Sequence, residues 1–131
     1  MRQSKNILDE YTRGITFTSK KTQKALNIAF NIMDKWALSA DEQRAILSLS
    51  EEASLDKHAD IAADASKELQ FRSSIIIGLY ADLKIVPPSP ELMSNWLRKT
   101  RADGETPINA LMSDEYQQML NLRASAKSLR Y

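Results

Sequence analysis

All four prolines of this chain lie after Ile85, and its 131 residues contain only three glycines. Helix interiors exclude proline, which lacks an amide donor, and disfavour glycine, which loses the most backbone entropy on folding. No proline therefore interrupts the helical periodicity over the first two thirds of the chain. The sequence predicts an all-α fold in which the prolines mark helix boundaries in the last third.

Apolar residues at helical spacing mark a first helix, which is predicted to run from Ser19 or Lys20 to Trp36. They form one stripe that we expect to lie in the core, made of Ala25, Ile28, Ala29, Ile32, Met33 and Trp36. Ser39 and Glu42 then have the spacing of a capping box, in which each residue bonds the backbone amide of the other. A short second helix is expected over about 40–48.

A third helical pattern begins at Ser50 after a turn at 48–50, and this completes a helix-turn-helix outline. A central helix is predicted over about 66–84, because residues before Pro87 avoid the helical region. Ser89-Pro90 and Thr106-Pro107 each pair a capping side chain with proline at the first helical position, so each predicts a helix start. The last helix should begin near 116.

A chain of this length suits one compact core. Residues 1–18 lack helical periodicity and are predicted to form a flexible arm. The rest divides into a helix-turn-helix-like region over 19–65 and a C-terminal region over 66–131, which are expected to fold as one unit.

The net charge of +1 gives no overall preference for nucleic acid or an anionic membrane. The longest apolar run, 75–80, is far shorter than the roughly 20 residues of a membrane span, and the N-terminus lacks the apolar segment of a signal peptide. The chain has no cysteine, which fits a reducing compartment. We expect a cytoplasmic protein that makes no contact with a membrane.

Few side chains suggest catalysis. His58 is the only histidine, and without cysteine a zinc site around it would need three carboxylates. Pairs such as Glu51 and Glu52 lie at a predicted helix start, where acids favour the helix dipole. No phosphate loop or nucleophile elbow is present. The sequence therefore predicts no enzyme, no catalytic or metal-binding residues and no cofactor.

The helix-turn-helix outline suggests DNA binding, with candidate contacts at Ser50, Ser54, Lys57 and His58. Between residues 39 and 68, however, eight acidic residues face only three basic ones. Because phosphate neutralisation supplies most DNA affinity, we expect DNA binding by this region to be weak or lost.

The C-terminal third contains the strongest interface candidates. Trp96 is expected to contribute its indole to the core, while the basic run Arg98, Lys99 and Arg101 faces a partner, since tryptophan and arginine are enriched at interface hot spots. The end of the chain, Arg130-Tyr131, has two interpretations: a fraying helix end, or an arm that inserts Tyr131 into a partner's cleft.

Several segments from about residue 25 to the C-terminus resemble the MbcA/ParS/Xre antitoxins, which neutralise RES-domain toxins. They are WALSADEQRAIL, FRSSIIIGLYADL, MSNWLRKT, RADGETPINALM and SDEYQQMLNLRASA. The chain departs from the family pattern at Leu47-Ser48, where Leu-Gly is usual, in the segment EEASLDKHAD, and at Lys99-Thr100-Arg101, where Pro-Asn is common.

The resemblance implies a degenerate helix-turn-helix N-terminal half and a helical C-terminal toxin-binding half. It implies a bacterial type II antitoxin that binds an NAD-consuming or ADP-ribosylating RES toxin and blocks its active site, as a homodimer or a hetero-oligomer with the toxin. The partner-binding residues that it implies are Trp96, Arg98, Lys99, Thr100, Arg101, Gly104, Thr106, Arg130 and Tyr131. Two alternatives stay open: an Xre-type repressor that binds operator DNA weakly, and a helical adaptor protein.

Overall fold

A computed structural model describes residues 19–56, 61–62, 67–83, 90–100, 104–113 and 115–127. The regular elements within these ranges are helices, which confirms the predicted all-α fold. They are α2 (Ser19–Lys35), α3 (Ala40–Ile46), α5 (Lys67–Leu83), α6 (Pro90–Arg98), α7 (Pro107–Met112) and α8 (Tyr116–Lys127). The expected arm, 1–18, lies outside the described residues.

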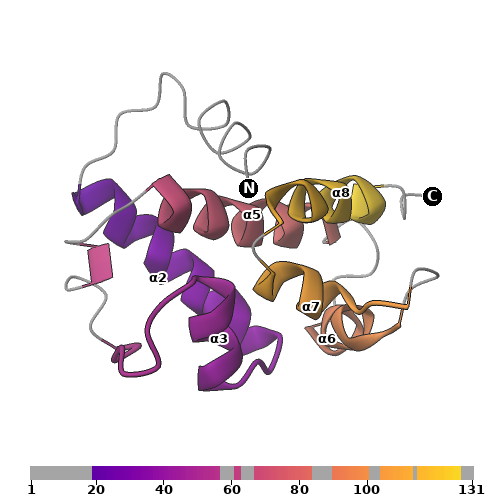
Figure 1. Cartoon of the computed structure of the whole chain (residues 1–131), viewed down its shortest axis with the longest axis horizontal. Coiled ribbons are helices and arrows are strands. Elements are labelled where there is room, and N and C mark those ends of the chain that lie inside the picture. Colours follow the sequence, from indigo (N-terminus) through magenta and orange to yellow (C-terminus); the bar gives the residue numbers. More distant parts are fainter. Residues whose placement is uncertain are drawn as a thin grey trace.

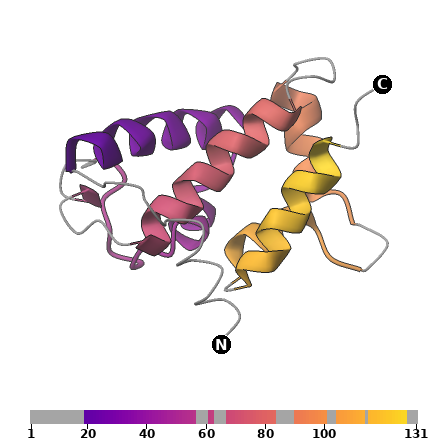
Figure 2. The same cartoon turned by 90° about the horizontal axis from the view of Figure 1, so that it is seen from above.

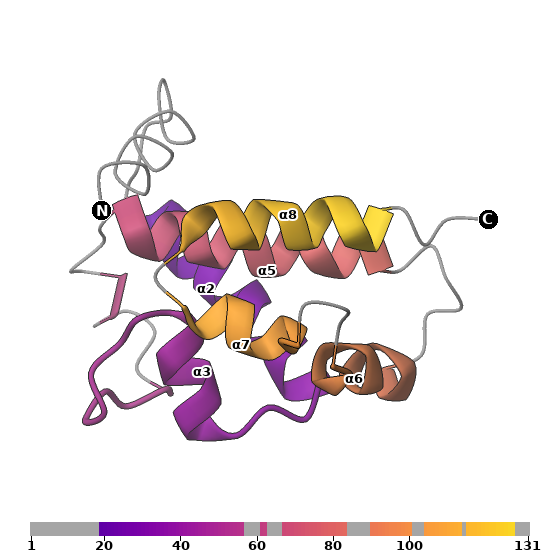
Figure 3. The same ribbon diagram turned by 45° about the vertical axis from the view of Figure 1, so that its right-hand side comes forward.

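Helix α5 is the centre of the molecule. It packs against α2 on one side and α8 on the other, and Figure 2 shows it crossing α2 obliquely while running beside α8 in the same direction. The shorter helices α3, α7 and α6 lie together below this layer (Figures 1 and 3). Helix α7 contacts α3, α6 and α8, so it links the two layers.

The buried residues agree with this arrangement. Phe71, Ile76 and Leu79 of α5 are fully buried. Trp36 is also fully buried, as predicted, and its Nε1 donates to the sulfur of Met93 at 3.4 Å. This contact joins the end of α2 to α6.

One member of the predicted core stripe is exposed. Ile28 keeps 48% of its surface accessible, whereas Leu26 and Phe30 are buried. Leu26, Ala29 and Met33 are fully buried, and Ile28 lies outside the buried face of α2. The expectation that Ile28 belongs to the core was wrong.

Two of the three predicted N-terminal caps are confirmed. Ser39 Oγ accepts from the Glu42 amide at 3.1 Å, and Glu42 Oε1 accepts from the Ser39 amide at 2.8 Å, which is the capping box. Thr106 Oγ1 accepts from the Asn109 amide at 3.3 Å, with proline in the first turn of α7. The Ser89 cap predicted for α6 lies outside the described residues.

Helices α2 and α3 are each followed, two residues after their last residue, by a non-glycine residue in the left-handed region: Ala37 with φ 58° and Ser48 with φ 57°. In each case the next amide bonds back to a carbonyl five residues earlier: Leu38 to Met33 at 3.2 Å and Leu49 to Arg44 at 2.8 Å. This is the Schellman arrangement, in which glycine usually occupies the left-handed position. Helix α3 therefore ends at Ile46, two residues before the predicted end.

The helix predicted to start at Ser50 does not begin there. Residues 50–56 form turns, and helical structure is present at 61–62. Arg44 Nε donates to the Ala53 carbonyl at 2.8 Å, and the Ser54 hydroxyl bonds the Asp56 carboxylate, so side chains hold this segment in a non-helical path. The rest of the prediction falls partly on residues 57–60 and 63–66, outside the described part.

None of the helices described here is long and apolar enough to cross a membrane.

Candidate partner-binding surface

The position of the C-terminal helices depends on a buried arginine in α5. Arg72 is 1% exposed, and its Nη1 donates to the carbonyls of Ile46 at 3.1 Å and Leu111 at 3.2 Å. Its Nη2 donates to the Ser113 carbonyl at 2.9 Å. These carbonyls belong to the ends of α3 and α7, where helix geometry provides no partner. One side chain thus fixes both helix ends against α5.

A second contact ties the start of α8 to α5. The Tyr116 hydroxyl donates to Glu68, and the Arg72 guanidinium lies over the Tyr116 ring, 5.6 Å from its centroid. Burial, and then the adjacent Glu68 carboxylate, raise the pKa of Tyr116 to about 12. Burial alone would raise the pKa of Glu68, but hydrogen bonds from Tyr116 and Ser48 together with the charge of Arg72 lower it.

Sequence reasoning missed this cluster. The only sequence signal is an arginine next to the most apolar segment of the chain, FRSSIII, where a charge needs partners when it is buried. The partners themselves are backbone carbonyls 26 to 41 residues away, so their identity required the fold.

The end of α6 is held to α3 by an ion pair. Arg98 Nη1 and Nη2 lie 3.0 and 2.9 Å from the two carboxylate oxygens of Glu42, and Nη2 lies 3.5 Å from the Ala37 carbonyl. The hydrogen bond from Arg98 is the main cause that lowers the pKa of Glu42, and Glu42 in turn raises the pKa of Arg98. Glu42 therefore acts twice, as the capping residue of α3 and as the partner of α6.

The nine residues expected to bind a partner divide into four groups. Trp96 is half-buried and packs against the core, in line with the expectation for its indole. Arg98, Lys99 and Thr100 are exposed around the end of α6. Gly104 and Thr106 lie in the connection to α7, which contacts α6 (Figure 3). Arg101, Arg130 and Tyr131 lie outside the described residues.

Two of these residues have a local structural role. Gly104 has φ 86°, a conformation that glycine adopts without strain. Thr106 caps α7. Gly104 permits the backbone conformation at its own position, and Thr106 fixes the start of α7. We call the set Trp96, Arg98, Lys99, Thr100, Gly104 and Thr106 the α6–α7 surface.

The candidate DNA contacts have an unfavourable setting. Ser50 and Ser54 are exposed, but Glu51, Glu52 and Asp56, next to them in the chain, are exposed as well. These carboxylates would repel phosphate groups. Lys57 and His58, the two candidates able to carry positive charge, lie outside the described residues.

The described part of the chain contains no group of three or more histidine, cysteine, aspartate or glutamate residues placed to hold a metal ion. Two of its ion pairs connect helices, Arg98 with Glu42 and Arg123 with Asp82.

In comparisons with known proteins, no family model, no curated protein and no solved structure matches this chain. Its function is therefore argued from its own residues and from the motif resemblance described above.

Proposed function

We propose that this chain is the antitoxin of a type II toxin-antitoxin system and that it binds a RES-domain toxin through the α6–α7 surface. The observation that supports this most directly is the pair of hydrogen bonds between Arg98 and Glu42, 56 residues apart in the chain. They hold the exposed end of α6 in one position relative to α3.

A surface held in place by its own molecule has an advantage in binding. Ordering loops and side chains at an interface opposes association, so a surface that is already fixed loses less conformational entropy on binding. Here one end of the α6–α7 connection is held by Arg98 and Glu42, and the other by the Thr106 cap of α7. Lys99 and Thr100 project between these two points.

The chemistry of the surface suits an acidic partner. A half-buried tryptophan next to an arginine and a lysine is a composition typical of interface hot spots. A toxin that consumes NAD or transfers ADP-ribose has a cleft for an anionic dinucleotide. In our proposal the cations of the α6–α7 surface contact acidic residues on the rim of that cleft, outside the part that holds the phosphates. The antitoxin prevents substrate entry by covering the cleft, without chemistry of its own.

The repressor alternative has less support, because Glu51, Glu52 and Asp56 are exposed near the candidate DNA contacts. The helical adaptor alternative differs from the antitoxin proposal in its partner, and a direct experiment distinguishes them.

The experiment is co-expression of this chain with the product of the adjacent reading frame, with cell growth, NAD level and co-purification as readouts. We expect the neighbour alone to stop growth and lower NAD, and this chain to restore both while co-purifying with it. Lys99→Glu should weaken rescue, whereas Lys24→Glu, an exposed lysine on α2, should not. A neighbour without toxicity, or rescue without a complex, would overturn the proposal.

A further inference from the structure

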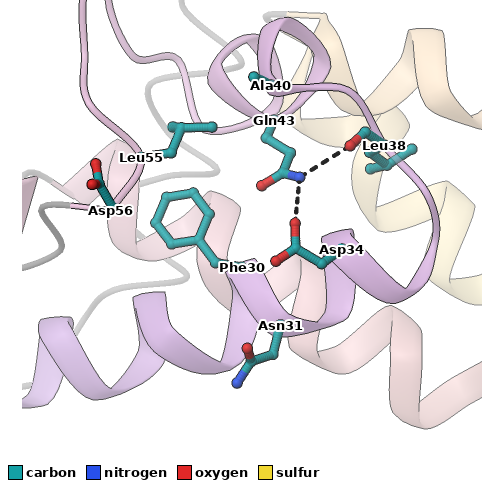
Figure 4. A pocket seen from close by; sticks show the side chains of 8 residues that line it. All are labelled: Phe30, Asn31, Asp34, Leu38, Ala40, Gln43, Leu55 and Asp56. Carbon is teal, nitrogen blue, oxygen red and sulfur yellow. Dashed lines mark hydrogen bonds between the residues drawn. The ribbon is translucent and has the colours of Figure 1, made fainter.

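A groove of about 530 Å³ lies between α2, α3 and the turn at 55–56, and it shares no residue with the α6–α7 surface. Figure 4 shows Phe30, Leu38 and Leu55 around it, with the carboxylates of Asp34 and Asp56 on different sides. None of the described residues that line it is basic. Its volume falls within the roughly 300 to 1,000 Å³ typical of ligand-binding pockets.

Gln43 is the polar group that defines the chemistry of the groove. Its side chain is 4% exposed, and Nε2 donates to Asp34 Oδ1 at 2.9 Å and to the Leu38 carbonyl at 3.1 Å. Because both partners are acceptors, the NH₂ group must face them, which fixes the orientation of the amide. The oxygen Oε1 therefore points the other way, toward the side of Phe30 and Leu55 (Figure 4).

No hydrogen bond reaches Gln43 Oε1 from the part of the chain that the structure describes. The atom is not among the buried polar atoms that lack a partner, so it remains accessible from the groove, and a ligand that enters can donate a hydrogen bond to it. Asp34 and Asp56 add two negative charges at the edges of the same groove. The matching ligand is a cation that donates several hydrogen bonds and has an apolar stem to lie against Phe30, Leu38 and Leu55.

We propose that this groove binds an arginine side chain of a partner protein. Arginine carries five N–H donors in a planar fork and a three-carbon stem, so one guanidinium can bond a carboxylate and the Gln43 oxygen together. Lysine is a compact, strongly hydrated charge and matches separated acceptors less well. The groove exceeds the space that one side chain needs, so residues flanking the arginine also enter it.

The experiment is an NMR titration of the ¹⁵N-labelled chain with N-acetyl-arginine methylamide. The same titration with the citrulline analogue, which is neutral but similar in shape, tests whether binding needs the positive charge of the ligand. The lysine analogue keeps the charge and tests whether binding needs the planar fork of N–H donors. We expect saturable shifts at Phe30, Asp34, Gln43 and Leu55 with the arginine compound, and roughly tenfold weaker binding of each control, which corresponds to about 1.4 kcal/mol.

Variants test the assignment within the groove. Asp56→Asn should weaken binding of the arginine compound several-fold, and so should Asp34→Asn, which keeps an acceptor for Gln43. Glu52→Gln removes an exposed charge outside the groove and should leave binding unchanged. Asp56 is exposed, so its variant should fold even if Asp34→Asn does not.

Three results would overturn the proposal. Binding of the citrulline analogue with equal affinity would show that the positive charge of the ligand does not contribute. Shifts spread over Glu51 and Glu52 would indicate non-specific attraction to an acidic surface. Tighter binding of free L-arginine than of the blocked compound would assign the groove to a small molecule. None of these readouts involves a toxin, so the proposal stands or falls independently of the antitoxin function.

Discussion

Arg98 of α6 makes two hydrogen bonds to the carboxylate of Glu42 in α3, at 2.9 and 3.0 Å. These bonds link two helices whose paired residues are 56 positions apart in the chain. Glu42 also completes the capping box at the start of α3. The orientation of the α6–α7 surface is thus linked to the folding of the N-terminal half. This link and the packing around it lead to testable predictions.

A double-mutant cycle should detect the ion pair. Glu42→Gln keeps an acceptor for the Ser39 amide but removes the charge, and Arg98→Met keeps an apolar stem. We expect a coupling free energy of about 0.5 to 1 kcal/mol, because the Arg98 side chain is 45% exposed and exposed ion pairs contribute little. Urea denaturation of the four proteins measures it. Strictly additive effects would mean that the pair does not form in solution.

The contribution of Glu42 should depend on pH with a defined sign. Its folded pKa is lowered, chiefly by the hydrogen bond from Arg98, so the carboxylate stabilises the fold above its unfolded pKa of about 4.3. That stability is lost as the pH falls through the lower folded pKa. The difference in urea midpoint between wild type and Glu42→Gln should therefore be constant near neutrality and shrink in acid. A difference that grows in acid would contradict the assignment.

Ala37 follows α2 in the left-handed region, where a side chain costs roughly 1 to 2 kcal/mol that glycine avoids. Glycine also loses more entropy on folding, by roughly 0.5 to 1 kcal/mol, so Ala37→Gly should stabilise the protein by a net amount of up to about 1.5 kcal/mol. Ala45→Gly, an exposed position inside α3, is the matched control and should destabilise it. Thermal denaturation of both variants measures the difference. Destabilisation by both would show that Ala37 is not held in this conformation.

Gly78 of α5 provides space for Arg123 of α8. A Cβ at position 78 would lie 2.7 Å from Arg123 Nε, which itself donates to Asp82 Oδ2 at 3.0 Å. Asp82 is 5% exposed, so displacing Arg123 weakens the ion pair that offsets the burial of the Asp82 carboxylate. We expect Gly78→Ala to destabilise the protein by about 1 to 3 kcal/mol. In an Arg123→Ala background, Gly78→Ala should lower the free energy of unfolding much less. An equal loss in both backgrounds would show that contact between the new Cβ and Arg123 is not the cause.

The parts of this structure that were predictable from sequence are those set by residues close together in the chain. Ser39 with Glu42, and Thr106 with Pro107, mark helix starts because capping acts over three or four positions. These signals located the helix starts at Ala40 and Pro107. The predicted end of the central helix before Pro87 lies outside the described residues.

The features that a sequence pattern did not reveal depend on distant partners. The Nη1 atom of Arg72 donates to carbonyls of α3 and α7, and Gly78 leaves space for an arginine 45 residues later, so neither role has a local signature. The helix expected from Ser50 is not formed at 50–56 for a similar reason: Arg44 Nε donates a hydrogen bond to the Ala53 carbonyl and stabilises a non-helical backbone there. The position of the basic residues Arg98 and Lys99 at the end of α6 was predictable from the sequence, whereas the pairing of Arg98 with Glu42 was not.

The most direct test of the antitoxin account is the dissociation constant of the complex with the RES-domain toxin, measured by calorimetry for wild type, Lys99→Glu and Lys24→Glu. Both lysines are exposed, one at the end of α6 and the other on α2. The account predicts that Lys99→Glu weakens binding by roughly tenfold or more, at least about 1.4 kcal/mol, and that Lys24→Glu leaves it unchanged. Equal affinity of wild type and Lys99→Glu would contradict the claim that the α6–α7 surface contacts the toxin.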